Sequence, residues 1–296
     1  MNALRLSARA PAKVNLGLEV IGRRPDGYHE VVTVLQAISL ADRFVWQETG
    51  QPFRYHGPQG VPPEIDLVAR ALALASDRER WTGELRVRKW VPAAAGLGGG
   101  SSDAALALRL ALPDADDATL ASHAARLGSD VPFFLGPTGR ALATGTGTTL
   151  EPLPDMDGWF VLVTPDVQID GKTVALYRGL QPEDFTDGLL TRSLSARMSE
   201  GNCWPGEIPN AFLRQLLGIH EVRYAYDCLW QAGANCVTAS GAGPTLYAFV
   251  VTWAEAKAIA RRMPPDAGAT RVARSIGAPD IDAATRIARA LRGRRD

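Results

Sequence analysis

Residues 91–105 read Val91-Pro92-Ala93-Ala94-Ala95-Gly96-Leu97-Gly98-Gly99-Gly100-Ser101-Ser102-Asp103-Ala104-Ala105. Before this stretch, residues 85–90 alternate apolar and polar side chains, as a half-buried strand does. After it, residues 104–112 are rich in strong helix formers, and Pro113 ends that helix. Ser101 and Ser102 can cap the helix. The stretch therefore predicts a glycine-rich turn that leads from a strand into a helix.

Such a turn has the chemistry of a phosphate-binding loop. Glycine lets the backbone bend tightly and leaves no Cβ in the way of a ligand. The unpaired N–H groups and the positive dipole end of the following helix attract an anion. A flexible linker is the plain alternative, but linkers are not usually followed at once by a capped apolar helix. We therefore expect a phosphate to bind here.

Counting positions excludes two other phosphate-binding motifs. The dinucleotide fingerprint G-x-G-x-x-G would begin at Gly96 and Gly98, but Ser101 stands where its third glycine belongs. The Gly-Lys-Thr ending of a P-loop occurs at 171–173, but Asp166 occupies the position of the first glycine of that motif. The loop thus belongs to neither class.

The overall composition excludes several kinds of partner. The chain has 296 residues, enough for one large or two medium domains with sizeable cores. Its 32 basic and 32 acidic residues balance, which gives no reason to expect nucleic acid or an anionic membrane as a partner. No apolar run approaches the roughly 18 residues of a membrane span, and the N-terminus lacks the apolar core of a signal peptide. We expect a cytoplasmic protein.

The sequence gives no sign of a structural metal. Cys203, Cys228 and Cys236 are odd in number and are never spaced C-x-x-C, which argues against a disulfide framework or a zinc site. The acidic residues at 114–117 lack the glycine and distal glutamate of a calcium loop. They are typical first-turn charges of a helix that follows at 118–127.

Two charged side chains stand in apolar surroundings. Lys13 lies in the alternating segment 10–20, which follows a first strand at 4–9, and it shares a face with Asn15. A charge that protects an exposed sheet edge is the plain alternative for this lysine. Asp130 lies between the end of a helix and an apolar segment, so we expect it to be partly buried. Helix capping or a structural salt bridge is the alternative for this aspartate.

Periodicity and turn residues predict the remaining elements. In the first half they are a turn at 22–30, a strand at 31–38, a poorly patterned strand pair with a loop at 44–60, and a helix capped by Asp66. A proline-rich boundary follows at 151–155. In the second half they are a strand at 159–163, a helix at 222–230, strands at 236–239 and 245–251 joined by the turn 240–244, and an amphipathic helix at 280–291. The strand-helix-strand order of the second half favours a ferredoxin-like sheet.

Several of these stretches together resemble the GHMP kinases, a superfamily that includes galactokinase, homoserine kinase and mevalonate kinase. The matching motifs are Pro-Ala-Lys-x-Asn-Leu at 11–16, Asp-Gly-Tyr-His at 26–29, the glycine-rich loop at 92–102, Gly-x-Asp-Val-Pro at 128–132 and Ser-Gly-x-Gly at 240–243. Residues 96–105 look most like the diphosphocytidyl-methylerythritol kinases, one branch of the superfamily. The Asp-Gly-Tyr-His tetrad belongs to that branch and not to other GHMP kinases.

The resemblance implies a role for each matching residue. Asp130 would accept the proton of an acceptor hydroxyl. The charge of Lys13 would keep Asp130 ionised and would lower the pKa of that hydroxyl. The residues implied to bind ATP are Asp66, Pro92, Gly96, Leu97, Gly98, Gly99, Gly100, Ser101, Ser102, Gly241 and Gly243. The residues implied to bind the acceptor are Asn15, Tyr28, His29 and Tyr177, the last three at a cytidine base. The glycine-rich stretch 141–147 would lie beside the site.

The implied fold is α+β, with the two domains of a GHMP kinase. An N-terminal α/β domain of ribosomal-protein-S5-like type, residues 1–155, would bind ATP and carry the catalytic residues. A C-terminal ferredoxin-like domain, residues 156–296, would complete the substrate cleft.

The implied reaction is transfer of the γ-phosphoryl group of ATP to the 2-hydroxyl of 4-diphosphocytidyl-2-C-methyl-D-erythritol, in non-mevalonate isoprenoid precursor biosynthesis. ATP would be a co-substrate accompanied by Mg²⁺, for which the sequence offers no clear carboxylate ligand. The other small-molecule partner would be a cytidine diphosphate-linked sugar alcohol. We expect a monomer or homodimer, without nucleic-acid or membrane partners.

Some positions depart from the family pattern. Asp66 replaces an asparagine near the adenine, so a hydrogen-bond donor is lost there. Ala94 replaces a loop glycine, and Ala242 replaces a serine. Residues 169–172 stand where relatives usually have small hydroxylated residues. These departures indicate a divergent member whose substrate contacts differ in detail.

Three alternative functions remain open from the sequence. A nucleic-acid-binding role, which some folds of this type carry, would call for a basic face, and the neutral charge balance gives it no support. A GHMP kinase for another small alcohol, such as homoserine or mevalonate, would be expected to lack the Asp-Gly-Tyr-His tetrad. A non-catalytic nucleotide-binding module on the same fold would be expected to have lost Lys13 or Asp130, and both are present.

Overall fold

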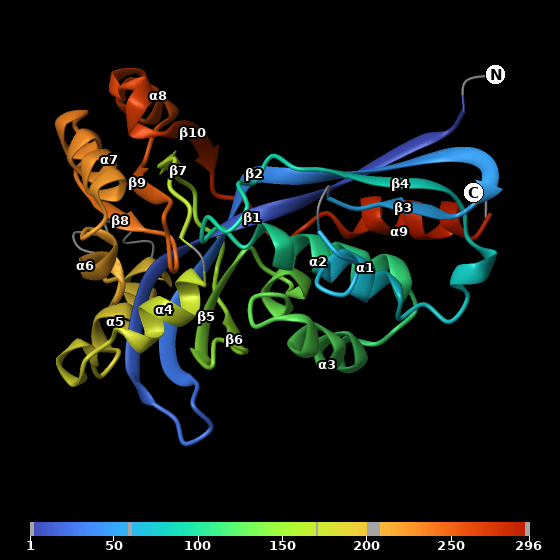
Figure 1. Cartoon of the computed structure of the whole chain (residues 1–296), viewed down its shortest axis with the longest axis horizontal. Coiled ribbons are helices and arrows are strands. Elements are labelled where there is room, and N and C mark those ends of the chain that lie inside the picture. Colours follow the sequence, from blue (N-terminus) through green and yellow to red (C-terminus); the bar gives the residue numbers. More distant parts are fainter. Residues whose placement is uncertain (1–2, 59–60, 170, 200–207, 294–296) are drawn as a thin grey trace.

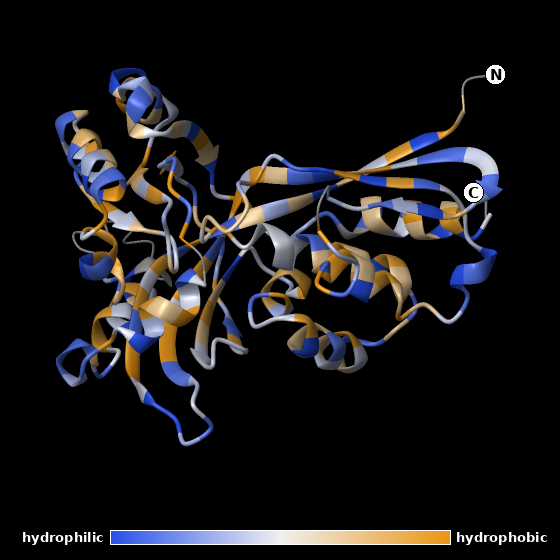
Figure 2. Cartoon of the chain, viewed as in Figure 1, coloured by the Kyte–Doolittle hydropathy of each residue, from blue (hydrophilic) through white to orange (hydrophobic). Residues whose placement is uncertain are grey.

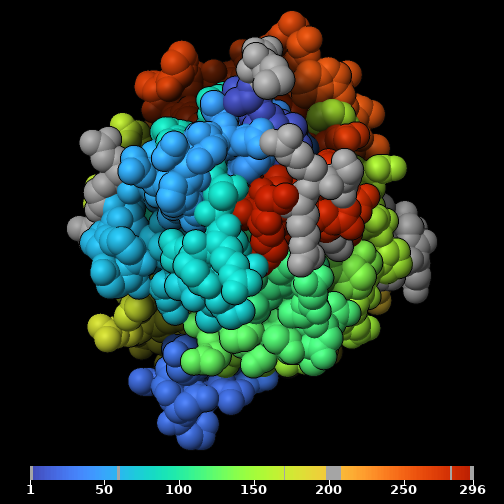
Figure 3. All heavy atoms as spheres, turned by 90° about the vertical axis from the view of Figure 1, so that its right-hand side faces the viewer, coloured from blue at the N-terminus to red at the C-terminus, as the bar shows by residue number. Residues whose placement is uncertain are grey.

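Two long antiparallel strands join the two halves of the molecule (Figure 1). They are β1 (Arg5–Arg23) and β2 (His29–Pro52), and they pair along the whole of β1. The computed structural model that shows them describes all residues except 1–2, 59–60, 170, 200–207 and 294–296. The turn between these strands projects from the molecule at the bottom of Figure 3.

The prediction of separate strands at 4–9 and 10–20 is wrong, because β1 is continuous through both. The pairing of β1 with β2 shifts register between Pro11 and Ala12 and between Asn15 and Leu18. Such irregularities bend a strand without ending it. The predicted strand at 31–38 is likewise only the first part of β2.

The larger sheet has the order β3-β4-β2-β5-β6, with β1 paired to β2. Its other strands are β3 (Arg54–His56), β4 (Thr82–Arg88), β5 (Arg140–Gly145) and β6 (Thr149–Pro152). The helices beside it are α1 (Leu67–Leu72), α2 (Gly99–Ala111), α3 (Asp117–Leu127) and α9 (Ile281–Leu291) (Figure 1). Apolar residues of these helices and strands (Figure 2) form one buried core, which consists largely of alanine and leucine.

The smaller sheet confirms the predicted ferredoxin-like order. Its strands are β7 (Trp159–Thr164), β8 (Val237–Ala239), β9 (Leu246–Val250) and β10 (Ala269–Arg274). They are antiparallel in the order β10-β7-β9-β8, which places the first and third strands in the middle. Helices α7 (His220–Gln231) and α8 (Trp253–Arg262) pack against this sheet. The α+β fold of the GHMP kinases is thereby confirmed.

The connections contain shorter elements. They are α4 (Lys172–Arg178), α5 (Leu189–Ser199) and α6 (Leu213–Leu216), with 3₁₀ turns at Arg78–Arg80 (η1), Pro132–Leu135 (η2), Pro182–Asp184 (η3) and Pro265–Ala267 (η4). Cys228 and Cys236 are buried and form no disulfide among the described residues, and Cys203 lies outside those residues.

Helix α9 returns from the end of the chain to the first sheet. It packs against β1 and α2, and it buries Ile287 and Leu291 in the core of the larger sheet. The division into residues 1–155 and 156–296 remains a prediction, but this helix of the predicted C-terminal domain lies with the N-terminal elements (Figure 1). An amphipathic helix is buried wherever an apolar face is open to it, whatever its position in the chain.

The glycine-rich loop leads into α2 three residues earlier than predicted. Gly98 is the N-cap, with φ of 68°, and no side chain caps the helix. The prediction that Ser101 and Ser102 cap α2 is therefore wrong, because both lie within its first turn. Glycine adopts the left-handed conformation at no steric cost, so the helix can begin at Gly99. Its first N–H groups remain open to an anion.

A buried carboxylate holds the start of the loop. Asp42 is fully buried in β2 and accepts hydrogen bonds from the backbone N–H groups of Trp90 (2.5 Å) and Val91 (2.9 Å). The Lys89 ammonium bonds both Asp42 and Asp103 of α2, the latter at 2.6 Å. Burial opposes the protonation of Lys89, but the charges of Asp103 and Asp42 outweigh it and raise the pKa of this lysine. The cluster ties β2, the loop and α2 together.

We predict that Asp42→Ala lowers the free energy of unfolding by about 3 kcal/mol or more, because it leaves buried donors and a lysine without their partner. Urea unfolding measures this loss. Asp26→Ala, in the exposed turn between β1 and β2, is the matched control and should change it by less than about 1 kcal/mol. Similar losses in both variants would contradict the role of Asp42.

Candidate active site

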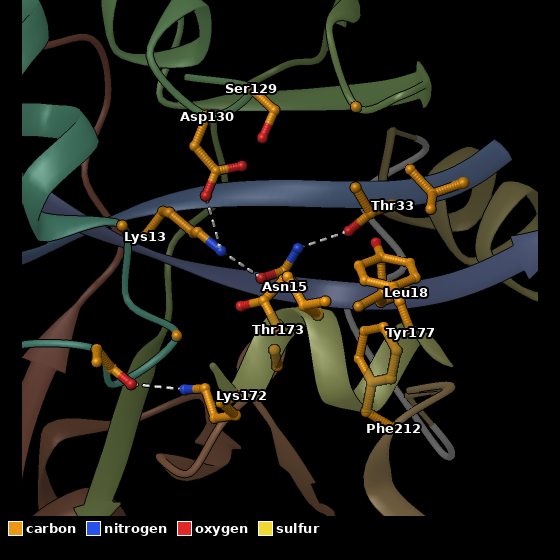
Figure 4. A pocket seen from close by; sticks show the side chains of 18 of the residues that line it. Lys13, Asn15, Leu18, Thr33, Ser129, Asp130, Lys172, Thr173, Tyr177 and Phe212 are labelled. Carbon is orange, nitrogen blue, oxygen red and sulfur yellow. Dashed lines mark hydrogen bonds and ion pairs between the residues drawn. The ribbon is translucent and has the colours of Figure 1, made fainter. Parts of the chain in front are cut away.

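A cavity of about 460 Å³ opens beside the glycine-rich loop (Figure 4). Its lining comes from both halves of the chain, with Lys13 of β1 and Asp130 on one side and Lys172 and Tyr177 of α4 on the other. The volume lies in the range of small-molecule sites in proteins. The cavity therefore brings predicted site residues from distant parts of the sequence into one space.

Lys13 and Asp130 form an ion pair in this cavity. Lys13 Nζ lies 3.4 Å from Asp130 Oδ2 and donates a hydrogen bond to Asn15 Oδ1 at 2.7 Å. Lys13 is only 4% exposed, whereas the Asp130 side chain is 33% exposed. A lysine that protects a sheet edge would be solvated, so the edge-charge alternative does not describe Lys13. The carboxylate remains accessible to a ligand.

Hydrogen bonds fix the position of Asn15. Its Nδ2 donates to Thr33 Oγ1 at 2.8 Å, and the Thr33 hydroxyl donates to the carbonyl of Gly17 at 2.6 Å. The hydroxyl of Tyr247, from β9, donates to the Asn15 carbonyl at 2.7 Å. Lys13 is thus held by a network that includes a residue of the second sheet.

The glycine-rich loop lies directly against Lys13. The backbone N–H of Lys13 donates to the carbonyl of Leu97 at 2.9 Å. A Cβ placed on Gly98 would lie 2.9 Å from Lys13 Cγ and 3.2 Å from the Phe134 ring. The unpaired N–H groups at the start of α2 therefore lie close to the ion pair. Only glycine fits at position 98, against the side chains of Lys13 and Phe134.

The hairpin turn 240–244 closes on the same loop. Ser240 Oγ donates to the carbonyl of Gly96 at 2.9 Å, and a Cβ on Gly96 would lie 2.0 Å from the Ser240 carbonyl oxygen. Asn210 holds this turn, since its Nδ2 donates to the carbonyls of Ala239 (2.8 Å) and Gly241 (3.0 Å). The two glycine-containing loops of the predicted motifs thus form one wall of the site.

Two aromatic rings, Tyr177 and Phe212, line the other end of the cavity, where Tyr177 packs edge-on against Phe212 with ring centroids 4.8 Å apart (Figure 4). The ring of His29 lies next to Tyr177, also at 4.8 Å. Tyr28, by contrast, is 67% exposed in the turn between β1 and β2. His29 and Tyr177 are therefore brought together from the two halves, whereas Tyr28 stands apart.

His29 and Tyr177 are both uncharged at neutral pH and can form hydrogen bonds as neutral groups. Burial, with the nearby charge of Arg23, lowers the pKa of His29, so its imidazole is neutral at pH 7. Burial, with the nearby Asp130, raises the pKa of Tyr177 to about 12. The Tyr177 phenol therefore remains a hydrogen-bond donor.

The structure divides the predicted site residues into two groups. Those that line the cavity are Lys13, Asn15, Gly96, Gly98, Asp130, Tyr177 and Gly241. Those that do not line it are Tyr28, His29, Asp66, Pro92, Leu97, Gly99, Gly100, Ser101, Ser102 and Gly243. Asp66 is buried as the N-cap of α1, where its oxygens accept from Val68 N–H and the Tyr55 hydroxyl. Ser102 lines a separate small cavity behind the loop.

Several lining residues were not predicted as site residues from the sequence, among them Thr33, Phe212 and Lys172. Thr33 and Phe212 have no local signal, because one is an ordinary strand residue and the other lies in the weakly patterned region 180–215. Lys172 stood out only as a departure from the family pattern. The glycine-rich stretch 141–147 was predicted beside the site, and Thr146 and Gly147 do line the cavity.

Comparisons with known proteins identify the family of this chain. Residues 66–136 match the model of the GHMP kinases N terminal domain. The chain is 38% identical over 252 residues to the 4-diphosphocytidyl-2-C-methyl-D-erythritol kinase of Dehalococcoides mccartyi. This alignment covers 82% of this chain and 88% of that protein. The chain is 34% identical over 267 residues to the same kinase of Burkholderia mallei, covering 86% and 89%. The chain belongs to this kinase family.

Solved structures agree with this assignment. The crystal structure of a 4-(cytidine 5'-diphospho)-2C-methyl-D-erythritol kinase matches with a TM-score of 0.76 and 32% identity, covering 91% of this chain and 99% of that one. Homoserine kinase from Cytophaga hutchinsonii matches with a TM-score of 0.66 but only 16% identity, covering 92% and 94%, so it shares the fold alone. As a GHMP kinase, this diphosphocytidyl-methylerythritol kinase family member uses ATP. None of its helices, in the ranges that the structure describes, could cross a membrane.

We predict that Gly98→Val lowers the affinity of this kinase for ATP by about tenfold or more, because the side chain requires a strained φ and displaces Lys13. Calorimetric titration with ATP measures the affinity. Gly22→Val, where an added Cβ meets no atom within 4 Å, is the matched control and should bind ATP normally. Full affinity in a folded Gly98→Val variant would exclude the loop as the phosphate site.

Proposed function

We propose that this chain transfers the γ-phosphoryl group of ATP to the 2-hydroxyl of 4-diphosphocytidyl-2-C-methyl-D-erythritol, in isoprenoid precursor biosynthesis. Its relatives carry the name of this kinase. The observation that supports the proposal most is the buried Lys13 beside the accessible Asp130, next to the open start of α2. This arrangement joins a phosphate-binding terminus to a base within one cavity.

The chain's own residues would act mainly by position and charge. The N–H groups from Gly98 to Ser101 would receive the phosphates of ATP, as helix N-termini commonly do. Phosphoryl transfer involves little covalent chemistry by the protein, so placing the acceptor in line with the γ-phosphate supplies most of the acceleration.

Asp130 would accept the proton of the acceptor hydroxyl, as its 33% exposed side chain allows. Lys13 would stabilise the charge that develops on the hydroxyl oxygen and on the transferred group. The hydrogen bond from Lys13 to Asn15 keeps the ammonium in place during this transfer. A non-catalytic module would have no need of this pair.

Mg²⁺ would accompany ATP and neutralise charge on its phosphates. No group of three or more His, Cys, Asp or Glu side chains comes together among the residues that the structure describes. Mg²⁺ usually keeps several waters and binds through substrate phosphates with one or two carboxylates. The ion would therefore be held here chiefly by phosphate oxygens and water.

The cytidine base would bind against the adjacent His29 and Tyr177 rings. A neutral imidazole offers one donor and one acceptor, which suits the mixed edge of cytosine. The Tyr177 ring, supported edge-on by Phe212, offers a flat face for stacking. The exposed position of Tyr28 leaves the base contacts to the other two residues.

We predict that Asp130→Asn lowers turnover by about 10²–10⁴-fold, the usual effect of losing a general base, while both substrates still bind. A coupled ATPase assay with the diphosphocytidyl substrate, homoserine and mevalonate measures turnover and acceptor choice together. Asp114→Asn, an exposed aspartate ahead of α3, is the matched control and should be fully active. Transfer to homoserine or mevalonate in preference would exclude the proposed acceptor, and near-normal turnover would make Asp130 structural.

We predict that His29→Ala lowers the affinity for the diphosphocytidyl substrate by roughly 5- to 150-fold, because it removes one hydrogen-bonding pair from the base. The affinity for ATP should stay nearly unchanged. Calorimetry gives Kd for each ligand. His220→Ala, at the exposed start of α7, is the control for loss of an imidazole. Equal weakening of both ligands would mean that His29 supports the fold instead.

A further inference from the structure

Lys172 is a buried cation that the proposed mechanism does not use. It is the first residue of α4, it is 7% exposed, and it lines the cavity (Figure 4). Its ammonium donates to the carbonyl of Ala94 in the glycine-rich loop at 2.5 Å and to the carbonyl of Gly243 in the hairpin turn. The lysine therefore bridges the two loops that form the wall of the site.

The charge of Lys172 is not balanced by a carboxylate. Among the described residues, no Asp or Glu lies within ion-pair distance of its ammonium, although buried charges are normally paired. Burial and the charge of Lys13 lower the pKa of Lys172 to about 8. Among the lining residues that the structure describes, two lysines share the cavity with one carboxylate, Asp130, so this part of the cavity favours an anionic ligand.

The hydrogen-bonding capacity of Lys172 is also incomplete. An ammonium group has three N–H donors, and two are used by Ala94 and Gly243. These two carbonyls fix the position of the nitrogen at the cavity wall. Among the described residues no third acceptor bonds it, and an anionic oxygen forms the strongest bond with the remaining N–H.

We propose that Lys172 is a second phosphate-binding cation of this site, beside Lys13, and that it donates its remaining N–H to a phosphate oxygen of a bound nucleotide. The inference deepens the proposed function and rests on it. ATP and the diphosphocytidyl acceptor both carry such oxygens, so the chemistry is shared and the titrations below distinguish the two sources. The two backbone bonds pre-position the ammonium, which lowers the entropic cost of the contact.

The backbone of Ala94 offers a competing role that the test must separate. Ala94 has φ of 50°, in the left-handed region that favours glycine, and its carbonyl is one of the two acceptors of Lys172. The lysine could therefore act only by holding this loop conformation, without contacting a phosphate. In that case Ala94→Gly, which relieves the strain, would restore function to a variant that lacks the lysine.

The experiment compares Lys172→Met, Lys172→Arg and the double variant Ala94→Gly with Lys172→Met, all in the full chain. Calorimetry with adenylyl imidodiphosphate and with the diphosphocytidyl substrate gives Kd for each source of phosphate. We expect Lys172→Met to lower the affinity for one of these two ligands by about 10- to 100-fold. Lys172→Arg should retain most of that affinity. Lys257→Met, on the exposed face of α8, is the matched control and should bind both normally.

The pH dependence gives a readout that a merely structural lysine would not move. Besides Lys172, the titratable groups among the described lining residues are Lys13 of β1, Asp130 after α3 and Tyr177 of α4, and the pKa of Tyr177 at about 12 lies above the window used. A phosphate raises the pKa of Lys172 on binding, so the affinity of the wild type should fall by about tenfold or more as pH rises from 7 to about 9.5. Lys172→Arg stays charged and should show a much smaller fall. This comparison holds even if Lys172→Met does not fold.

Two results would overturn the proposal. One is unchanged affinity for both ligands in Lys172→Met, and the other is full recovery in the double variant with Ala94→Gly. Failure of the proposed function is separate, because it would appear in the wild type as a lack of transfer to the diphosphocytidyl substrate. A loss of adenylyl imidodiphosphate affinity in Lys172→Met would still support the phosphate contact in that case.

Discussion

The pairing of β1 with β2 is the constraint on which the rest of the structure depends. One end of β1 contributes Ala8 and Ala10 to the core beneath the helices, and the other contributes Leu18 and Val20 to the core of the smaller sheet. The two halves are therefore held by continuous, hydrogen-bonded backbone (Figure 1). Because Lys13 lies between these ends, the position of its ammonium is fixed relative to both walls of the cavity.

A buried lysine costs free energy unless its charge is compensated, and the surroundings of Lys13 show how this is done. The Lys13 ammonium donates a hydrogen bond to Asn15 and forms an ion pair with Asp130. The amide of Asn15 is fixed in turn by its hydrogen bond to Thr33. Because Asp130 remains partly exposed, the same compensation leaves an accessible carboxylate in the cavity. One ion pair thus compensates a buried charge and presents a carboxylate to the cavity.

The close approach of the glycine-rich loop to the hairpin turn explains why both stretches need glycine. A side chain at Gly96 would collide with the Ser240 carbonyl, and one at Gly98 would displace Lys13. The contact brings a loop of the first half against a turn of the second, so this wall of the cavity requires both halves of the chain. The lysine at 172 reinforces that contact by bonding to each side of it.

Local sequence patterns predicted many of the helices and strands and pointed to Lys13 and Asp130 as candidate site residues. Alternation, helix formers and caps such as Asp66 are local properties, and the spaced motifs identified Lys13 and Asp130 before any contact between them was known. The tertiary structure alone decided that β1 is one strand, that α9 packs beside α2, that Tyr28 is exposed, and that Lys172 bridges two loops. These features depend on packing between residues far apart in the chain, and no local pattern records such contacts.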